Sequence, residues 1–323
     1  MALNTEAEPL VTCVLNCFSS AGTLPEALRS ILAQNHKRLE VIAVNNASVD
    51  ETAAILQHYS AADPRLTVLT NPRWINPYES WRRGINASSG DFIFLANDDD
   101  VWDPRFVNTL LRGLITTGGA LAFCDVETFG TDASHRYVHH YASAANQHHL
   151  VLEDSFAGRR ARLKAIVSKN LGPEKIAPNL FYSLYPAEPL RRISQHPLIW
   201  TEYGFVDERY IWAPHSYKGP WYFAHQTLLR RRVGNSRPPL DPAMVAPRVA
   251  TRSIPRMEVR KVIFLRRLLS HPGTPLCDRL LVVLPMLLGQ AFAAFVRPRV
   301  EAGKQTVLRI VQRTKHPDAR EAD

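Results

Sequence analysis

Two glycine-rich loops that bind phosphate in many nucleotide-binding proteins are missing from this sequence. No Gly-x-Gly-x-x-Gly follows the first apolar run, at residues 10–15, and no Gly-x4-Gly-Lys-Ser/Thr occurs anywhere. Such loops cradle a pyrophosphate on the backbone N–H groups at a helix N-terminus. Their absence argues against a Rossmann dinucleotide site and against a P-loop nucleotide site.

Cysteine is also scarce. The four cysteines show no paired spacing typical of a zinc site, so we expect buried free thiols in a reducing compartment. Residues 1–9 are polar and acidic, without the basic and apolar regions of a signal peptide, so we expect a cytoplasmic location. No basic motif interleaved with aromatic residues appears, so we expect no nucleic-acid partner.

Positive charge is plentiful, but it is concentrated towards the C-terminal end. The net charge is +9; residues 251–323 carry 14 Lys and Arg against 6 Asp and Glu, while the first 250 residues carry 25 against 24. Residues 280–296 form an uncharged run of 17 residues between two basic amphipathic segments. This length is at the lower limit for a membrane span, and Pro285 and Gly289 interrupt the run. We therefore favour an interfacial helix at an anionic membrane surface over a packing helix or a true span.

Apolar runs alternate with segments of helical periodicity through the first 126 residues. This alternation predicts a doubly wound, mainly parallel sheet of the α/β class. We expect a capping box from Thr23 to Glu26 at the start of the first helix, and a late strand at residues 221–229 that ends in three arginines. The other expected strands occupy residues 10–15, 39–44, 66–70, 92–96 and 120–126, and later helices are expected after residue 50 and at residues 79–87 and 104–117.

An acidic loop follows the fourth of these strands, in the stretch DFIFLANDDDVWD at residues 91–103. The apolar run stops at Asn97, and Asp98, Asp99 and Asp100 follow directly. In open α/β sheets ligands bind beyond the carboxyl ends of the strands. Three adjacent carboxylates repel one another unless a positive charge lies among them, and Mg²⁺ or Mn²⁺ bridges one or two carboxylates to substrate phosphates. The stretch therefore indicates a metal-phosphate site.

A simpler interpretation of the same stretch stays open. Asp103-Pro104 is typical of a helix start, with Asp at the N-cap and Pro at the first helical position. On this interpretation the aspartate triplet is a solvated acidic turn ahead of that helix. The choice between the two depends on the motifs that surround the triplet.

A strand leads to an Asn-Asn-Ala-Ser-x-Asp loop at residues 45–50, and further on Ser-Gly-Asp, a strand, the acidic loop and Val-Trp-x-Pro follow at residues 89–104. The order of these motifs resembles the family 2 glycosyltransferases of GT-A fold. The resemblance implies a GT-A-like, doubly wound sheet, and the charge distribution adds a helical, basic C-terminal extension. We therefore expect a glycosyltransferase domain at residues 1–250, with a nucleotide-sugar half at 10–125 and an acceptor half at 126–250, and a basic amphipathic tail at 251–323.

The resemblance also assigns roles to individual residues. Asp98, Asp99 and Asp100 resemble the Asp-x-Asp-type site for Mn²⁺ or Mg²⁺, and Asp98 is also assigned to substrate binding. The general base is expected in GFVDERYIW, with Asp207 preferred over Glu208 and with Glu202 and Asp154 as further alternatives. The other interpretation of Asp207 is a helix N-cap. The other residues assigned to substrate binding are Asn16, Cys17, Ser19, Asn45, Asn46 and Arg83.

The sequence departs from the family pattern where the nucleotide base is expected. Asn45 and Asn46 stand where the family usually has two acids, and Asn-Cys-Phe-Ser at residues 16–19 stands where it commonly has Pro-Thr-Tyr-Asn. An Asn carbonyl can still accept a hydrogen bond from a base N–H, and its amide can donate one. The departures leave the base open, although a UDP-sugar is favoured.

We therefore expect a metal-dependent, inverting glycosyltransferase that moves a sugar from a nucleotide-diphosphate sugar to a glycan or lipid-linked acceptor. The basic tail favours peripheral contact at the cytoplasmic face of a membrane. The alternative is a catalytically inactive, glycosyltransferase-like nucleotide-binding protein, which the asparagine substitutions suggest and the intact aspartate triplet opposes. A sugar-phosphate nucleotidyltransferase shares the sheet architecture, but it needs a glycine-rich loop after the first strand, where only Gly22 is present.

Overall fold

The computed structural model describes the chain at residues 8–130, 138–139, 157–159, 181–195 and 219–234, and at five single positions between 276 and 288. The chain divides into two compact units, Met1–Ser253 and Ile254–Asp323, and the elements discussed below belong to the first. The predicted general base, Asp207 or Glu208, and nearly all of the predicted tail at 251–323 lie outside the described residues. Within the described part of the chain, no helix has both the length and the apolar character that a membrane crossing requires.

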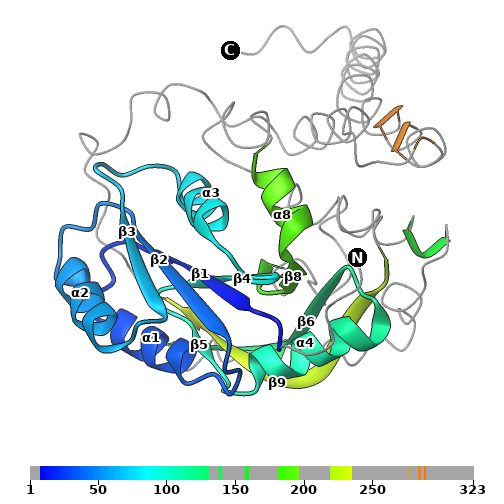
Figure 1. Cartoon of the computed structure of the whole chain (residues 1–323), viewed down its shortest axis with the longest axis horizontal. Coiled ribbons are helices and arrows are strands. Elements are labelled where there is room, and N and C mark those ends of the chain that lie inside the picture. Colours follow the sequence, from blue (N-terminus) through cyan, green and yellow to red (C-terminus); the bar gives the residue numbers. More distant parts are fainter. Residues whose placement is uncertain are drawn as a thin grey trace, which may run out of the picture. The chain divides into compact units, whose positions relative to one another are not determined.

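One mixed sheet contains all the strands of the described residues (Figure 1). Its parallel half consists, in spatial order, of β3 (Leu66–Thr70), β2 (Leu39–Asn45), β1 (Val11–Cys17) and β4 (Phe92–Asn97). Within this half each strand runs parallel to the next, which confirms the expected doubly wound α/β arrangement here. Every residue of β1 is buried, as expected for a central parallel strand that is covered on both faces.

The sheet continues beyond β4 with β8 (Leu184–Pro186), β6 (Leu121–Gly130), β9 (Trp221–Val233) and β5 (Val101–Trp102), while β7 (Val138–His139) pairs with β6. β8 is antiparallel to both its neighbours, and β9 is parallel to β6. The sequence predicted that β6 ends at residue 126 and β9 at residue 229. Both strands are longer, because their ladder continues to Gly130 and Val233, so the three arginines lie inside β9.

Helices cover both faces of the parallel half. α3 (Pro77–Ala87) and α8 (Ala187–Ser194) lie side by side over one face, and α1 (Leu24–Leu32) and α2 (Thr52–Ala62) lie on the other (Figure 1). α3 approaches the sheet closely at Gly84, where an added Cβ would lie 2.3 Å from Val14 Cγ1. α4 (Phe106–Thr117) packs against β6 and β9 and begins two residues later than predicted.

The predicted capping box at the start of α1 is wrong. Thr23 makes no side-chain bond to the first turn of the helix, and its hydroxyl lies 3.4 Å from the carbonyl oxygen of Ser20. The Glu26 carboxylate accepts a hydrogen bond from the Arg232 guanidinium in β9, at 2.5 Å. Arg232 is far from Glu26 in the chain, so no local sequence pattern indicates their contact. The spacing of Thr23 and Glu26 indicated only a capping box.

The cysteines of the described residues, Cys13, Cys17 and Cys124, are buried free thiols, as predicted. Burial raises the pKa of the Cys124 thiol to about 12 and raises that of Cys13 well above its usual value. Thiols that stay protonated at neutral pH are poor nucleophiles and poor metal ligands. These side chains therefore serve as small apolar groups in the core.

Glu40 ties β2 to the loop that precedes β4. Its carboxylate accepts hydrogen bonds from Thr12 Oγ1 at 2.5 Å and from Ser89 N and Oγ at 2.8 and 2.7 Å. Burial pushes the pKa of Glu40 upwards, but these hydrogen bonds outweigh burial, and the pKa lies below its usual value of 4.5. A lowered pKa means that folding favours the ionised carboxylate.

Glu40→Gln is expected to lower the free energy of unfolding by about 1 kcal/mol at neutral pH, because the amide presents an N–H to groups that themselves donate. A depressed native pKa stabilises the fold above the unfolded pKa, and this stabilisation is lost as the pH falls through the native pKa. The difference from wild type should therefore shrink below about pH 4 in urea denaturation. Glu188→Gln, which removes an exposed ion pair in α8, is the control. A difference for Glu40→Gln that does not change with pH would contradict this account.

Candidate functional site

The carboxyl ends of β1, β2 and β4 meet at one edge of the sheet. Cys17 lies opposite Asn45 and Asn16 lies opposite Asn97, so these three strands end in register. The backbone N–H of Phe18, just after β1, donates to Asp98 Oδ2 at 2.8 Å. The structure thus joins the segment assigned to the nucleotide with the acidic loop that follows β4.

The exit of β1 holds three of the residues assigned to substrate binding. Asn16 and Cys17 lie inside the strand, and Ser19 follows with a positive φ of 44°. The N–H of Ser19 donates to Ser48 Oγ at 3.0 Å, which fixes the loop after β1 to the loop after β2. Asn16 is 8% exposed, and its Oδ1 finds no hydrogen-bond donor within the described part of the chain. A buried oxygen without a donor costs about 1–3 kcal/mol, so a donor from a ligand would be favourable there.

Asn45 and Asn46, at the exit of β2, are both buried and both hydrogen-bonded within the chain. Asn45 Oδ1 accepts from the N–H of Ser48 at 3.0 Å. Asn46 Oδ1 accepts from Asn71 Nδ2 at 2.8 Å and from the N–H of Ile75 at 3.1 Å, and its Nδ2 donates to the Ile75 carbonyl at 2.7 Å. Asn46 therefore holds the segment after β3 in place, and a direct contact between Asn46 and substrate stays a prediction.

Arg83 lies on α3 beside the exit of β3. Its Nη1 donates to the Thr70 carbonyl at 2.8 Å and to Asn71 Oδ1 at 2.5 Å. Since Asn71 also donates to Asn46, Arg83 belongs to the polar network that connects the exits of β2 and β3. If Arg83 binds phosphate as predicted, its guanidinium must donate to the phosphate as well as to these two acceptors.

The three aspartates of the acidic loop differ in exposure and in partners. Asp98 and Asp100 are 0% and 1% exposed, while Asp99 is half-buried. Asp100 Oδ1 accepts from the Arg232 N–H at 2.8 Å, and its Oδ2 accepts from Asn97 Nδ2 at 3.2 Å. The solvated acidic turn that the sequence left open is therefore wrong for Asp98 and Asp100.

Asp100 also accepts a hydrogen bond from the Tyr182 hydroxyl. Burial and then the neighbouring charge of Asp99 raise the pKa of Asp100 to about 7, although its hydrogen bonds oppose the shift. Burial and the charge of Asp100 also raise the pKa of Tyr182 well above its usual value, so Tyr182 is a neutral donor. The loop thus holds a carboxyl whose ionisation is costly unless a positive charge arrives.

This donor set fits a hard divalent cation. All the donors are oxygens, and a cation would offset the repulsion that raises the pKa of Asp100. In the described residues, no three His, Cys, Asp or Glu side chains are grouped as a ready-made metal site. The protein would accordingly supply one or two carboxylates of the triplet, and substrate phosphates would complete the coordination.

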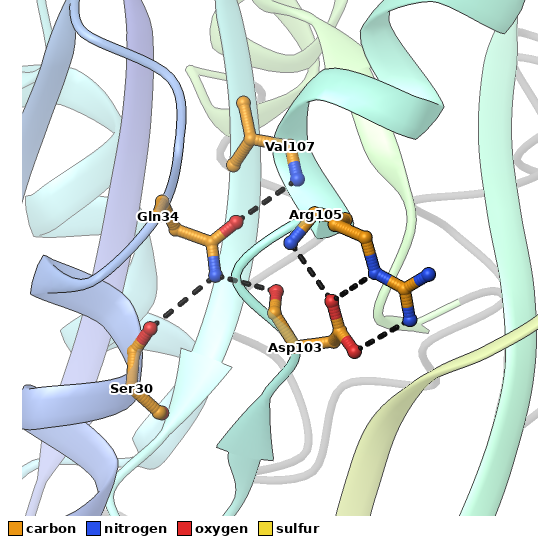
Figure 2. A network of polar contacts seen from close by, with 5 residues as sticks. All are labelled: Ser30, Gln34, Asp103, Arg105 and Val107. Atoms are coloured by element: carbon orange, nitrogen blue, oxygen red, sulfur yellow. Dashed lines mark hydrogen bonds and ion pairs between the residues drawn. The ribbon is translucent and has the colours of Figure 1, made fainter.

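The segment after the triplet is fixed to α1 by Gln34, which is 5% exposed (Figure 2). Gln34 Nε2 donates to the Asp103 carbonyl at 2.8 Å and to the Ser30 carbonyl at 3.3 Å, and its Oε1 accepts from the Val107 N–H at 3.0 Å. The Asp103 carboxylate lies against Arg105, with Oδ1 2.9 Å from both the backbone N and Nε (Figure 2). Asp103 therefore shapes the start of α4, and it does not join the triplet.

Sequence reasoning missed Tyr182, Arg232 and Gln34. Tyr182 precedes a three-residue strand in a stretch without readable periodicity. Arg232 was interpreted as lying beyond the end of a strand, and Gln34 follows a helix at a position where polar residues are ordinary. The available signal was charge: three arginines in one strand and three aspartates in one loop invite pairing, but the sequence does not show that the two segments are adjacent.

The family model of glycosyl transferase family 2 matches residues 10–168 of this chain. An uncharacterized glycosyltransferase of Haemophilus influenzae is 27% identical over 124 residues, covering 37% of this chain and 50% of that protein. The succinoglycan biosynthesis protein ExoO of Rhizobium meliloti is 28% identical over 124 residues, covering 38% and 35%. A GalNAc(5)-diNAcBac-PP-undecaprenol beta-1,3-glucosyltransferase of Campylobacter jejuni is 27% identical over 105 residues, covering 32% and 34%. The matched part of the chain thus spans half or less of the length of these relatives.

Among solved structures, TarS residues 1–349 of S. aureus in complex with UDP-GlcNAc has a TM-score of 0.59 at 13% identity, covering 90% of this chain and 74% of that one. TarS 1–349 in complex with UDP gives a TM-score of 0.54 at 12% identity, with 90% and 73% covered. These likenesses show a shared fold. The family match begins at residue 10 and contains the exits of β1, β2 and β4 together with the whole acidic loop. The chain is a member of glycosyl transferase family 2 with the GT-A fold.

Proposed function

We propose that this protein transfers a sugar from a nucleotide-diphosphate sugar to a glycan or lipid-linked acceptor, with inversion and with Mn²⁺ or Mg²⁺ bound. The observation that carries the proposal is that the carboxyl ends of β1, β2 and β4 meet at one edge of the sheet. There the Phe18 N–H donates a hydrogen bond to Asp98. This arrangement puts groups suited to a nucleotide beside carboxylates suited to a cation. The family membership and the complex of TarS with UDP-GlcNAc support the same donor class.

The nucleotide is proposed to bind at the exits of β1 and β2, where Asn16 Oδ1 can accept a hydrogen bond from it. Phe18, directly after β1, contacts Trp74 of the segment after β3 edge to face, with ring centroids 6.4 Å apart. Both rings are nearly buried, at 9% and 8% exposure. UDP is the favoured nucleotide because the neighbour of the same fold was solved with UDP and UDP-GlcNAc.

The diphosphate is proposed to lie at the acidic loop. When bound, a divalent cation neutralises the charge that develops on the leaving diphosphate. Asp98 fixes the Phe18 backbone, and Asn97 and Tyr182 orient the Asp100 carboxylate. These contacts hold the loop ready before the donor arrives, which lowers the cost of ordering the site.

The acceptor hydroxyl must lose its proton to a base within hydrogen-bond reach. Asp207 is proposed for this role, with Glu208 as the second choice. A base opposite the leaving diphosphate gives inversion at the anomeric carbon, because the acceptor then attacks from the face away from the departing group. The named roles of ExoO and of the Campylobacter enzyme support polysaccharide or lipid-linked acceptors.

Calorimetric titration with UDP, GDP and dTDP, each with and without Mn²⁺, tests the donor proposal. We expect UDP to bind, and Mn²⁺ to strengthen its binding by about tenfold or more, because the cation shares the diphosphate with the aspartates. Release of UDP from UDP-sugars in the presence of acceptor extracts then separates an active transferase from an inactive nucleotide-binding relative. Failure of all three nucleotides to bind in Mn²⁺ would defeat the proposal.

Peripheral membrane contact through the basic residues between 251 and 323 is a separate part of the proposal. Full-length protein is expected to sediment with vesicles that contain anionic lipid and not with neutral vesicles. Binding should weaken as salt is raised, since screening shortens the reach of surface charge to about 8 Å at physiological ionic strength. Equal sedimentation with both kinds of vesicle would contradict an electrostatic contact.

A further inference from the structure

Arg232 of β9 contacts the acidic loop with its backbone and with its side chain. Its backbone N–H donates to Asp100 Oδ1 at 2.8 Å, and its Nε donates to the Asp99 carbonyl oxygen at 3.1 Å. The same guanidinium donates through Nη2 to Glu26 Oε2 of α1 at 2.5 Å. Its Cζ also lies 4.4 Å from the centroid of the Phe129 ring in β6. One side chain thus connects the loop with α1 and with β6.

The charge of Arg232 does not act alone on the metal site. Glu26 forms an ion pair with it, so the guanidinium brings little net positive charge towards the triplet. An arginine beside the acidic loop without an acidic partner of its own would repel a divalent cation bound at that loop. The contact to the Asp99 carbonyl instead fixes the peptide that joins Asp99 to Asp100. Arg232 is therefore better suited to fix the conformation of the acidic loop than to neutralise the charge of its aspartates.

Arg230 provides an internal comparison, two residues earlier on the same strand. Its Cζ lies 4.5 Å from the same Phe129 ring, and its Nε lies 3.4 Å from Glu127 Oε2. Arg230 thus has the same ring contact and an ion pair of its own. These side-chain partners of Arg230 lie on β6, whereas those of Arg232 include the acidic loop.

We propose that Arg232, held by Glu26 and by Phe129, is a positioning residue that sets the conformation of the acidic loop and hence its affinity for the divalent cation and the nucleotide diphosphate. This inference rests on the proposed function, which places the cation and the diphosphate at the acidic loop. It also means that a strand from the acceptor half controls the donor site.

Four variants test the inference: Arg232→Ala, Arg232→Lys, Glu26→Gln and the control Arg230→Ala. Affinity for UDP with Mn²⁺, kcat and donor KM, and unfolding without ligand are measured for each. We expect Arg232→Ala to weaken UDP–Mn²⁺ binding and to raise donor KM by about tenfold, with a smaller change in kcat, because a charge-assisted hydrogen bond to the loop is lost. Arg230→Ala should lose similar stability and keep its affinity within about twofold.

The other two variants keep the test informative if Arg232→Ala is poorly folded. Lys at position 232 can reach Glu26 or the Asp99 carbonyl but lacks the planar fork that serves both, so it should lie between alanine and wild type. Glu26→Gln should weaken binding in the same direction by about two- to threefold, because the guanidinium loses its charged anchor. Equal binding by Arg232→Ala and Arg230→Ala would overturn the inference.

Amide hydrogen exchange gives a readout that needs no substrate. Exchange at residues 98–101 should be faster in Arg232→Ala than in wild type and unchanged in Arg230→Ala, since only the first variant frees the loop. If wild type binds no nucleotide, the proposed function fails, while exchange still shows whether Arg232 positions the loop. Unchanged exchange in Arg232→Ala overturns the inference even where sugar transfer is observed.

Discussion

Asp99→Asn is expected to reduce sugar transfer by about 10³-fold or more, because a bound metal supplies several kcal/mol of stabilisation to the leaving diphosphate and each 1.4 kcal/mol is a factor of ten in rate. Asp99 is the half-buried member of the triplet, whereas Asp98 and Asp100 are buried and accept hydrogen bonds from Phe18 and Arg232. Its replacement therefore removes a carboxylate at the site with the least disturbance to the loop. The fold should tolerate the change, since the asparagine also removes a charge that raises the pKa of Asp100.

Asp103→Asn is the matched control for this experiment. It makes the same change of carboxylate to amide a few residues further along, where the side chain pairs with Arg105 (Figure 2). Transfer is measured as UDP release from a UDP-sugar in Mn²⁺, with unfolding monitored in parallel. We expect the control to keep nearly full activity. Equal activity of Asp99→Asn and wild type would remove Asp99 from the metal site.

Asp100→Asn is expected to make the metal-free protein more stable at alkaline pH and to remove most of the stabilisation that Mn²⁺ gives. Burial and the Asp99 charge raise the native pKa of Asp100 to about 7, from a usual value of 3.8. A native pKa above the unfolded pKa means that ionisation opposes folding. The cost is absent below about pH 4, grows with pH, and is complete above about pH 7.

The asparagine removes this cost but gives up the hydrogen bond that Asn97 donates to Asp100 Oδ2. The net gain should be about 1–3 kcal/mol at pH 8 and should disappear near pH 4. Thermal unfolding in a chelator across this pH range measures the gain, and repeating it in Mn²⁺ measures the loss of metal stabilisation. A variant that is less stable than wild type at pH 8 without metal would show that Asp100 does not carry this cost.

The parallel half of the fold was predictable because its signals are local. Runs such as residues 92–96 are apolar from end to end, and the polar loops that follow them mark the strand exits. The acidic loop was found in the same way, as carboxylates at the end of a buried strand. The placement of Asn45 beside Cys17 then follows from the parallel order of β1 and β2.

The remaining contacts of the site were beyond the reach of sequence patterns. Asn97 meets Tyr182 at a separation of 85 residues, and Arg232 meets Glu26 at a separation of 206. Such pairs depend on which strands become neighbours, and β8 is too short to show a period of its own. Asn46 illustrates a subtler limit: its position was found, but its side chain is used to hold the segment after β3.

The late strand β8 sits between two strands that are synthesised much earlier. β4 and β6 leave the ribosome first, and β8 at Leu184–Pro186 fills the space between them only after residues 131–183 have followed. Until then the nascent chain carries an unpaired strand edge, and such edges recruit foreign strands. Residues 10–125 are consequently not a module that can be excised or recombined at residue 125. Chimeras between relatives must take β8 and β9 from the same parent as residues 10–125. Otherwise a strand edge stays unpaired and the acidic loop loses its contacts with Arg232.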